Sequence, residues 1–383
     1  MRRIDTDATG DIWGAIDDTF VNQVYEGTFE PTCVVFHWRE DSPALTIAPF
    51  DNSDNVDMDA VQELDIPFAR RYMIGGGHAL HVPETPMVQF WYRKEDTTLE
   101  AEINRAGRAC EQAMESLGLD AEYRPIGDLE IYVGNERVKI IAIGGGSVHF
   151  NDFYSITSGS LIWGVTEDFA VLDEISSPPP EKFEDKDTDK QATRMSPVEA
   201  LLDDLDADVT REAAIDALVD HSARKLVGAE NVEVADWDPE EAESIGEMRP
   251  FFERDSWVER KSATRMAQRA PADTDIGIAA YKSRKTLQAS VILDDNRILD
   301  VQLTGDLYIR PQATLTSPGA LEWLEDAIAG IESTDQARLE AAIGDAFDRY
   351  DIESPGIEPE HFALPVTRAA NNTVTVQEFL ADR

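Results

Sequence analysis

The sequence has few cysteines, few lysines and no long apolar run, and each shortage excludes a class of protein. Its two cysteines, Cys33 and Cys110, are too few for a disulfide framework or a cysteine-based structural zinc site. We expect both to be inert core residues. No segment approaches the roughly 20 apolar residues of a membrane span, and no apolar segment follows the first arginines as in a signal peptide. We therefore expect a cytoplasmic protein that does not bind membranes.

Basic residues are scarce as well. The chain has 34 Lys and Arg against 76 Asp and Glu, so its formal net charge is −42. Because proteins bind nucleic acid largely by neutralising phosphates with Lys and Arg, this balance argues against a nucleic-acid partner. The acidic residues are spread along the chain and 42% of the residues are hydrophobic, which indicates a folded protein. An acidic, lysine-poor surface is typical of a halophilic protein that works in concentrated salt.

The length of 383 residues exceeds that of an ordinary domain. We predict a large domain over residues 1–268 and a small one over 269–383, both of α+β class. In the large domain the pattern predicts an opening helix, strands expected to form one mixed or antiparallel sheet, a covering helix and further strands. These segments are 11–27, 32–38, 43–50, 66–82, 87–93, 96–118, 128–133, 137–143 and 156–165. A connector over 176–190 precedes a largely helical region, and the small domain has strands at 276–281, 286–293 and 298–309 before a helix at 318–331.

A run of three glycines is the first candidate for a ligand site. The glycines at 75–77 follow Arg70 and Arg71 and precede His81, between two strand-like segments. Glycine lets a backbone approach a ligand closely and turn its amide groups toward an anion. The neighbouring arginines and histidine favour this interpretation, and the alternative is a tight hairpin turn without a ligand.

Lys139 is the second candidate. It is the only lysine between Lys94 and Lys182, and it lies within an apolar strand-like segment. An ammonium group held at a sheet can attract a carboxylate and a phosphate together. The alternative is a strand lysine whose ammonium group extends into water.

Several segments, in this order along the chain, resemble the lipoate-protein ligase family. Segment 17–50 is similar to the family's opening helix, its Pro-led strand with Trp38 and the strand that follows. Segment 69–82, ARRYMIGGGHALHV, resembles the double-Arg, triple-Gly loop that ends in histidine. Four further segments are similar to parts of the family. Segment 127–141 resembles its Asp-strand-turn-Lys-Ile segment, and 157–162 resembles the segment that usually reads His-Gly-Thr-Leu-Leu. Segment 178–195 resembles the family's connector, and 291–309 resembles the hairpin of its accessory domain.

This resemblance implies a biotin/lipoate ligase catalytic domain, related to the cores of class II aminoacyl-tRNA synthetases, and a small C-terminal accessory domain. It implies that ATP activates lipoate to lipoyl-AMP, with Mg²⁺ bound alongside the nucleotide. The lipoyl group then passes to a lysine of a carrier domain, and catalysis rests chiefly on positioning and charge stabilisation. The expected carriers are the acyltransferase subunit of a 2-oxoacid dehydrogenase and the glycine cleavage H protein.

The resemblance also assigns roles to individual residues. Lys139 is the catalytic residue and bridges the lipoyl carbonyl and the phosphate oxygens. Arg70 or Arg71 meets a phosphate, and His81 supports the loop. The expected ATP- and lipoate-binding residues are Arg70, Arg71, Gly75, Gly76, Gly77, His78, Ala79, Leu80, His81, Ser158 and Gly159. No side chain is assigned to a metal.

Three departures from the family pattern matter. An ungapped alignment from the glycines places Tyr72 where the second family arginine stands. Ile141-Ala142 replace the usual Ser-Gly after the catalytic lysine, and Ser158 replaces the usual histidine. These departures leave open a different function, that of a catalytically weakened paralogue that binds lipoyl groups or their carrier without ligating.

Two related enzymes are also considered. An octanoyltransferase would need a cysteine to carry a thioester, and both cysteines lie outside the site-like loops. A biotin ligase would show a Gly-Arg-Gly-Arg type of loop, which the sequence does not contain.

Overall fold

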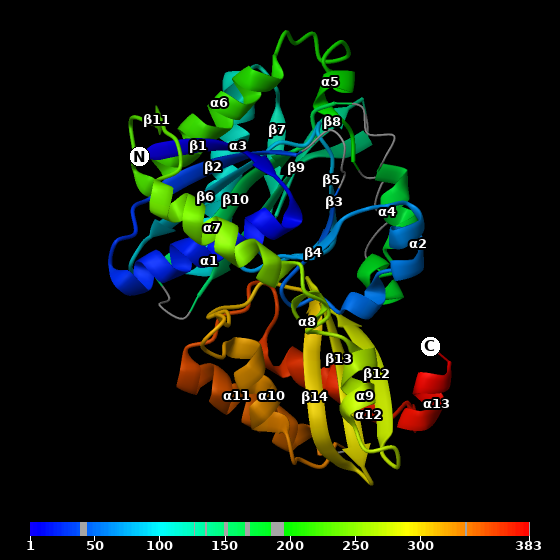
Figure 1. The fold of residues 1–383 in the computed structure, drawn as a ribbon. Coiled ribbons are helices and arrows are strands. Elements are labelled where there is room, and N and C mark those ends of the chain that lie inside the picture. The colour runs from blue at the N-terminus through cyan, green and yellow to red at the C-terminus, as the bar shows by residue number, and fades with distance from the viewer. Residues whose placement is uncertain are drawn as a thin grey trace.

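The computed structural model describes residues 1–38, 44–125, 127–134, 136–148, 152–164, 169–184, 195–333 and 335–382. An eight-stranded mixed sheet with helices on both faces and a three-stranded sheet form the larger part of the molecule. A four-stranded antiparallel sheet with its own helices lies below it in the view of Figure 1. In the described part of the chain, no helix combines the length and the apolar composition that crossing a membrane requires.

The eight-stranded sheet has the order β11-β1-β2-β6-β10-β9-β8-β7. Its strands are β1 (Arg2–Ala8), β2 (Thr32–Trp38), β6 (Met87–Arg93), β7 (Ala121–Arg124), β8 (Asp128–Val133), β9 (Glu136–Ser147), β10 (Phe153–Leu161) and β11 (Glu233–Val234). β11, β1 and β2 run parallel, and the helix α1 (Gly10–Glu26) joins β1 to β2. From β2 to β7 each strand is antiparallel to its neighbour.

The prediction that the chain opens with a helix was wrong, because β1 precedes α1. Only Ile4 and Ala8 of this strand are buried, which is too short an apolar pattern to indicate a strand. Its arginines are held by ion pairs with residues distant in sequence: Arg2 pairs with Glu241 and Arg3 with Asp216. Strand β1 is therefore stabilised by contacts that the local sequence does not show.

The glycines at 75–77 do not form a hairpin turn. The strands that flank them, β4 (Phe68–Arg70) and β5 (Ala79–His81), both pair with β3 (Ala44–Ile47), which lies between them. β4 is parallel to β3 and β5 is antiparallel to it. These three strands form a separate sheet, so the expectation of a single sheet before residue 94 was also wrong.

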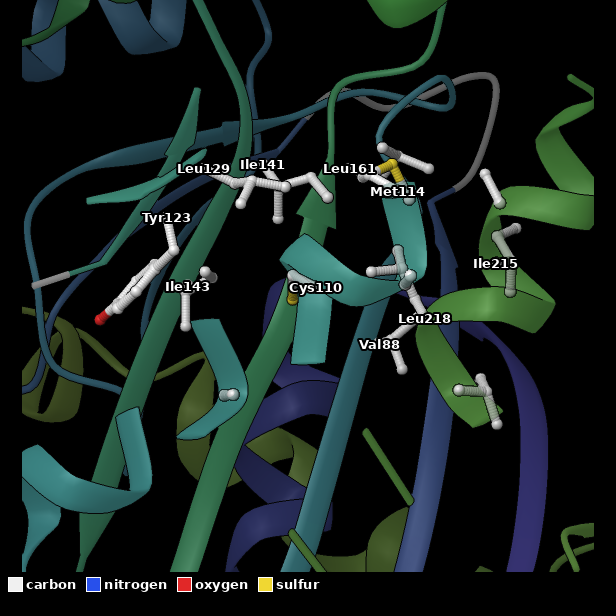
Figure 2. Close-up of a cluster of buried hydrophobic side chains, with 14 of the residues drawn as sticks. Val88, Cys110, Met114, Tyr123, Leu129, Ile141, Ile143, Leu161, Ile215 and Leu218 are labelled. Carbon is white, nitrogen blue, oxygen red and sulfur yellow. The ribbon is translucent and has the colours of Figure 1, made fainter. Parts of the chain in front are cut away.

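Helices cover both faces of the large sheet. On one face, α3 (Leu99–Ser116) and α6 (Arg211–Ser222) pack together, and Figure 2 shows Cys110 and Met114 beside Leu218. The other face is covered by α1 and α7 (Pro239–Phe252), which pack against each other. The apolar spacing predicted for residues 96–118 is confirmed, because every third or fourth residue of α3 is buried.

Short elements complete the larger part of the molecule. They are α2 (Met58–Glu63), α4 (Phe169–Ile175), α5 (Val198–Leu201) and α8 (Asp255–Val258). The connector is described up to residue 184 and contains the 3-10 turn η2 (Pro180–Phe183). Its remaining predicted residues, 185–190, lie outside the described part of the chain.

The C-terminal part is built on a sheet of order β14-β13-β12-β15. Its strands are β12 (Asp275–Lys282), β13 (Thr286–Asp294), β14 (Arg297–Asp306) and β15 (Thr373–Thr375). A second core joins this sheet to α10 (Ala320–Ile328), α11 (Gln336–Tyr350) and α12 (Ala363–Ala370). A smaller cluster joins α9 (Ala263–Arg269) and α13 (Val376–Ala381) to β12 and β13. The predicted domain boundary at 268/269 thus falls at the end of a helix that packs on this sheet.

Backbone contacts join the C-terminal part to the larger part. The Gly76 amide donates to the Leu307 carbonyl at 3.1 Å, and the Gln312 amide donates to the Ser147 carbonyl at 2.8 Å. The Glu353 carboxylate accepts from the amides at the start of α3, Leu99 at 2.9 Å and Glu100 at 3.1 Å. A carboxylate at a helix N-terminus is favourable, because the free amides and the helix dipole both attract negative charge.

A buried carboxyl group ties α1 to the large sheet. Asp17 of α1 accepts hydrogen bonds from Trp91 Nε1 at 2.8 Å, from Ser155 Oγ at 3.3 Å and from the Met73 amide at 3.2 Å. It is 0% exposed, and this burial raises its pKa to about 7. The folded chain therefore holds the Asp17 proton at pH values where the unfolded chain has lost it.

We predict that this proton makes stability depend on pH. Between about pH 4 and pH 7 the folded state binds one more proton than the unfolded state, so the free energy of unfolding falls as pH rises. From about pH 5 to pH 7.5 the wild-type protein should lose roughly 2–3 kcal/mol more than the Asp17→Asn variant, which cannot titrate there. Urea unfolding at both pH values measures the difference. Parallel losses in the two proteins would show that Asp17 is ionised throughout.

Candidate functional site

A cavity of about 700 Å³ lies between the large sheet, the glycine loop and the C-terminal part. The loop residues Gly75, Gly76, Gly77, His78, Ala79, Leu80 and His81 line one side of it. Lys139 and Asp128 line it from the large sheet, and Lys285 and Tyr308 line it from the C-terminal part. Segments far apart in the sequence therefore build a single site.

Close neighbours and backbone conformation both favour glycine in the glycine loop. A Cβ at Gly75 would lie 2.6 Å from the Leu307 carbonyl oxygen, and one at Gly77 would lie 2.8 Å from Lys182 Nζ. Gly76 has a φ of 104°, which side chains other than glycine rarely adopt. The amides of Gly75 and Gly76 donate to the carbonyls of Gly145 and Leu307, each at 3.1 Å. These two amides hold the loop in place, so an anion in the cavity would be met by other donors.

A second glycine run, at 144–146 in β9, accommodates the first. A Cβ at Gly146 would overlap the Met73 carbonyl oxygen, and one at Gly144 would lie 2.9 Å from Ile74 Cγ2. Side chains at these positions of β9 would push away the segment that leads into the glycine loop. The two glycine runs are thus complementary surfaces that pack backbone against backbone.

Of the two predicted arginines, only Arg71 lines the cavity. Arg70 is 0% exposed and donates to the carbonyls of Val258 at 2.7 Å, Ala48 at 2.8 Å and Asp51 at 2.7 Å. Its guanidinium is enclosed by these acceptors and cannot meet a phosphate, so the expectation for Arg70 was wrong. The Arg71 guanidinium donates to the Gly77 carbonyl and lies over the Trp13 ring.

Lys139 lines the cavity from β9 and has a defined partner. Its ammonium Nζ lies 2.6 Å from Asp128 Oδ1 on the neighbouring strand β8. Its side chain is 23% exposed, so the ammonium group does not extend freely into water. The pair holds a positive charge at the end of the cavity nearest the large sheet.

His81 packs beneath the loop. Its ring stacks on Trp38 with centroids 4.0 Å apart, and its Nε2 lies 2.9 Å from Thr46 Oγ1 of β3. Burial, with a smaller effect of the Arg71 guanidinium, lowers the pKa of His81 to about 3. The ring is therefore neutral at physiological pH and ties β5 to β3 without adding charge.

His78 joins the loop to two other segments. Its Nδ1 lies 2.5 Å from Ser176 Oγ at the start of the connector, and its Nε2 lies 3.2 Å from Asp51 Oδ2. Burial acts to raise the pKa of Asp51, but the nearby His78 and Lys182 outweigh it and lower that pKa. The loop, the segment after β3 and the connector are thus fixed relative to one another.

Ser158 and Gly159 do not line the cavity, although both were expected to do so. The register of β10 shifts between Thr157 and Ser160, and it is these two residues that line the cavity. Ser158 is 0% exposed, and its carbonyl accepts from the Cys110 thiol at 2.8 Å. The strand irregularity turns the middle residues toward α3 and its neighbours in the core.

Several cavity residues were not found from the sequence. They are Asp128, Lys182, Lys282, Arg284, Lys285, Asp306 and Tyr308. A signal existed, because the chain has only nine lysines and four of them line this cavity. Lysine is rare throughout the chain, so Lys182, Lys282 and Lys285 were candidates on the same ground as Lys139.

Asp306 organises part of this positive charge. Its carboxylate lies 3.6 Å from Lys182 Nζ and 3.7 Å from Lys285 Nζ. Burial acts to raise the pKa of Asp306, but Lys285 and Lys182 outweigh it and hold that pKa well below its usual range. The Lys285 ammonium also lies 4.6 Å from the centre of the Tyr308 ring.

The cavity also has apolar side chains in its lining. They include Trp13, Met87, Ala142, Ile162 and Leu172. An apolar chain would be buried against such side chains, while an anionic group would be attracted to the ammonium groups. The cavity thus suits a molecule that carries both parts, such as an acyl group joined to a phosphate.

A sequence model described as the lipoyl protein ligase A/B catalytic domain matches residues 14–223. A search of curated protein sequences gives no match.

Solved structures with the same fold include lipoate-protein ligases. A bipartite lipoate protein ligase from Thermoplasma acidophilum, solved with its E2 lipoyl domain, has a TM-score of 0.52 at 19% identity and covers 68% of this chain and 96% of its own. LipL1 of P. falciparum in complex with lipoate has a TM-score of 0.63 at 10% identity and covers 97% and 99%. A lipoate-protein ligase A bound with ATP has a TM-score of 0.51 at 16% identity and covers 68% and 98%. At these identities the likeness shows the fold, which confirms the predicted fold class.

We predict that Gly146→Ala destabilises the protein, because its Cβ would displace the Met73 carbonyl and the glycine loop behind it. Overpacking of this kind typically costs about 1–3 kcal/mol. Gly344→Ala in α11 is the matched control, since nothing lies within 4 Å of its Cβ and alanine favours helix. Thermal melts should show a lower midpoint for the first variant and an equal or higher one for the second. Equal midpoints for Gly146→Ala and wild type would contradict the packing of the two glycine runs.

Proposed function

Because this chain belongs to the lipoyl protein ligase A/B catalytic domain family, we propose that it is an ATP-dependent lipoate-protein ligase. The observation that carries the proposal is a cavity lined both by apolar side chains and by ammonium groups. Lipoate has the matching parts, an apolar acyl chain and a carboxylate that must meet a nucleotide phosphate. Relatives of the same fold were solved with lipoate and with ATP.

In the first step, a lipoate carboxylate oxygen attacks the α-phosphorus of ATP and pyrophosphate leaves with the bonding electron pair. The acyl chain would lie against apolar lining residues such as Met87 and Leu172, with its carboxylate beside Lys139. The Lys139 ammonium, held by Asp128 at 2.6 Å, stabilises the negative charge that the phosphate oxygens gain. The site contributes chiefly by positioning both substrates and by this fixed charge.

In the second step, the amine of a carrier lysine attacks the acyl carbonyl carbon and AMP leaves. The carrier amine loses a proton and an amide bond forms. The same Lys139 ammonium now stabilises charge on the carbonyl oxygen and on the departing phosphate. The carrier would be a lipoyl domain of a 2-oxoacid dehydrogenase acyltransferase subunit or a glycine cleavage H protein, and one relative was solved with its E2 lipoyl domain.

Mg²⁺ would enter with the nucleotide. The described residues contain no cluster of three or more His, Cys, Asp or Glu side chains suited to a metal ion. Mg²⁺ is commonly bound through one or two carboxylates together with substrate phosphates, and Asp128, Glu130 and Asp306 line the cavity. These carboxylates could hold the ion next to the phosphates, where it would supply additional positive charge.

Of the residues that depart from the family pattern, Tyr72, Ile141 and Ser158 do not line the cavity, whereas Ala142 does. That three of the four lie outside the cavity lining favours an active enzyme over a weakened paralogue. The Tyr72 hydroxyl accepts from the Leu315 amide at 3.0 Å, and its ring packs on Phe252 and Trp257. Ile141 is 0% exposed and packs with the residues that α3 and α6 bury. Neither replacement removes a side chain that faces the ligand space.

Thioester chemistry is disfavoured by the same geometry. Cys33 and Cys110 are 0% exposed, as expected for inert core residues, and neither lines the cavity. Burial raises the pKa of both thiols, so the reactive thiolate is suppressed. An acyl transfer through cysteine therefore has no suitable nucleophile among the described residues.

Acid-dependent ATP consumption tests the proposal directly. In about molar KCl, which suits an acidic halophilic protein, the purified protein should exchange pyrophosphate into ATP only when lipoate or octanoate is present. With an unlipoylated carrier domain added, mass spectrometry should show the carrier gaining one lipoyl group. ATP turnover that is equal with and without either acid would refute the ligase.

Lys139 gives the sharper test. Lys139→Ala should lower the rate of lipoyl-adenylate formation 10²–10³-fold, equivalent to about 3–4 kcal/mol, because a fixed positive charge is lost. Lys139→Arg should not restore it, since a planar guanidinium presents its donors differently from a compact ammonium. The exposed Lys225 provides the matched control, and Lys225→Ala should keep the wild-type rate. Melting curves confirm folding, and near wild-type rates in both Lys139 variants would remove Lys139 from the mechanism.

A further inference from the structure

We propose that the turn between β12 and β13, residues 282–285, binds the pyrophosphate part of the nucleotide. It would thereby act in the activation step alone. The inference rests on the proposed ligase function and adds a specific role for the C-terminal part. Lys282, Arg284 and Lys285 all line the cavity, although they lie more than 140 residues after Lys139 in the sequence.

The concentration of positive charge in this turn is unusual for the chain. Lysine and arginine make up 34 of 383 residues, yet three of the four residues at 282–285 are basic. A chain of net charge −42 repels anionic ligands at long range, so a nucleotide needs a local group of cations. The free energy of binding a polyphosphate must come from these few side chains and from any ion that accompanies it.

The turn is placed next to the glycine loop by Asp306. This carboxylate contacts Lys285 and, on its other side, Lys182, whose ammonium adjoins Gly77. A continuous series of basic groups therefore runs from the glycine loop, through Lys182, to the turn.

Tyr308 connects the turn to β9, the strand that carries Lys139. Its hydroxyl donates to the Ile143 carbonyl of β9 at 3.2 Å, and Lys285 lies over its ring at 4.6 Å. Lys139 lines the cavity from β9 and Lys285 lines it from the C-terminal part. A nucleotide whose α-phosphate reacts beside Lys139 would have its other phosphates within reach of the turn.

In the proposed arrangement the two groups of cations act on different products of the activation step. When the bond between the α-phosphorus and the bridging oxygen breaks, the bonding pair stays with the pyrophosphate, which gains negative charge. Cations at the turn would stabilise that charge, whereas the mixed anhydride stays beside Lys139. The transfer step involves no pyrophosphate, so the turn should have no effect on it.

The test uses the full-length chain and two variants of the turn. Lys282→Gln with Arg284→Gln leaves the Lys285–Asp306 pair intact and guards against misfolding, while Lys282→Gln with Lys285→Gln removes both lysines. Calorimetry with inorganic pyrophosphate, ATP and AMP reports on binding. Charge-assisted hydrogen bonds contribute enough that we expect at least about tenfold weaker binding of pyrophosphate and ATP. AMP affinity should be unchanged, and Lys225→Gln should match the wild type throughout.

Two rate measurements complete the test. Lipoyl-adenylate formation from ATP should fall at least about tenfold in both variants, in line with the lost affinity. Transfer from chemically prepared lipoyl-adenylate to a carrier domain should keep the wild-type rate. If AMP affinity or the transfer rate falls instead, the turn contacts the adenosine or the carrier and the inference is wrong. If the melting temperature changes while binding and rates do not, the lysines only stabilise the fold around Asp306, and the inference is also wrong.

The outcomes for the proposed function are separate. A wild-type chain that binds pyrophosphate through the turn but forms no adenylate with lipoate or octanoate would refute the ligase while keeping the turn as a polyphosphate site. A wild-type chain that forms the adenylate, with variants that bind pyrophosphate normally, would keep the ligase and refute the role of the turn.

Discussion

The contact of backbone with backbone around the glycine loop is the constraint on which the rest of the site depends. The Gly75 amide donates to β9 at Gly145, and the Gly76 amide donates to the C-terminal part at Leu307. Side chains on either surface would separate them, because a Cβ at Gly75 or Gly146 would meet a carbonyl oxygen. The large sheet, the loop and the C-terminal part can enclose one cavity only because glycine lets their backbones approach one another closely. The packing therefore requires residues without a side chain, which explains why glycine occurs in both runs.

Charge is the second constraint, and it acts against the composition of the chain. An acidic protein must gather cations wherever it binds an anion, and this one places four of its nine lysines around the cavity. Each well-placed ammonium has a carboxylate beside it, Asp128 for Lys139 and Asp306 for Lys182 and Lys285. These carboxylates limit the repulsion among the cations and fix their positions, which is what a preorganised site needs.

Two of the departures from the family pattern change residues of the core and not residues that face the ligand. Tyr72 and Ile141 stand at positions adjacent to the predicted site residues, yet both side chains are buried in cores. Their replacement changes packing, and the ligand space keeps its lining. The same distinction applies to Arg70 and Arg71, of which one binds carbonyls in the interior and the other lines the cavity.

The sequence by itself determined the local elements and the rare residues. The apolar spacing of α3, the apolar runs of β2, β6 and β9, the glycines at 75–77 and the isolated Lys139 were all visible in it. Only the tertiary structure decided that β3 separates β4 from β5, that Arg71 and not Arg70 faces the cavity, and that the bulge in β10 presents Ser160 in place of Ser158. It also brought the turn at 282–285 to the glycine loop. The physical reason is that periodicity reports which residues of one element share a face, whereas strand partners and the direction of each face depend on contacts between residues distant in the sequence.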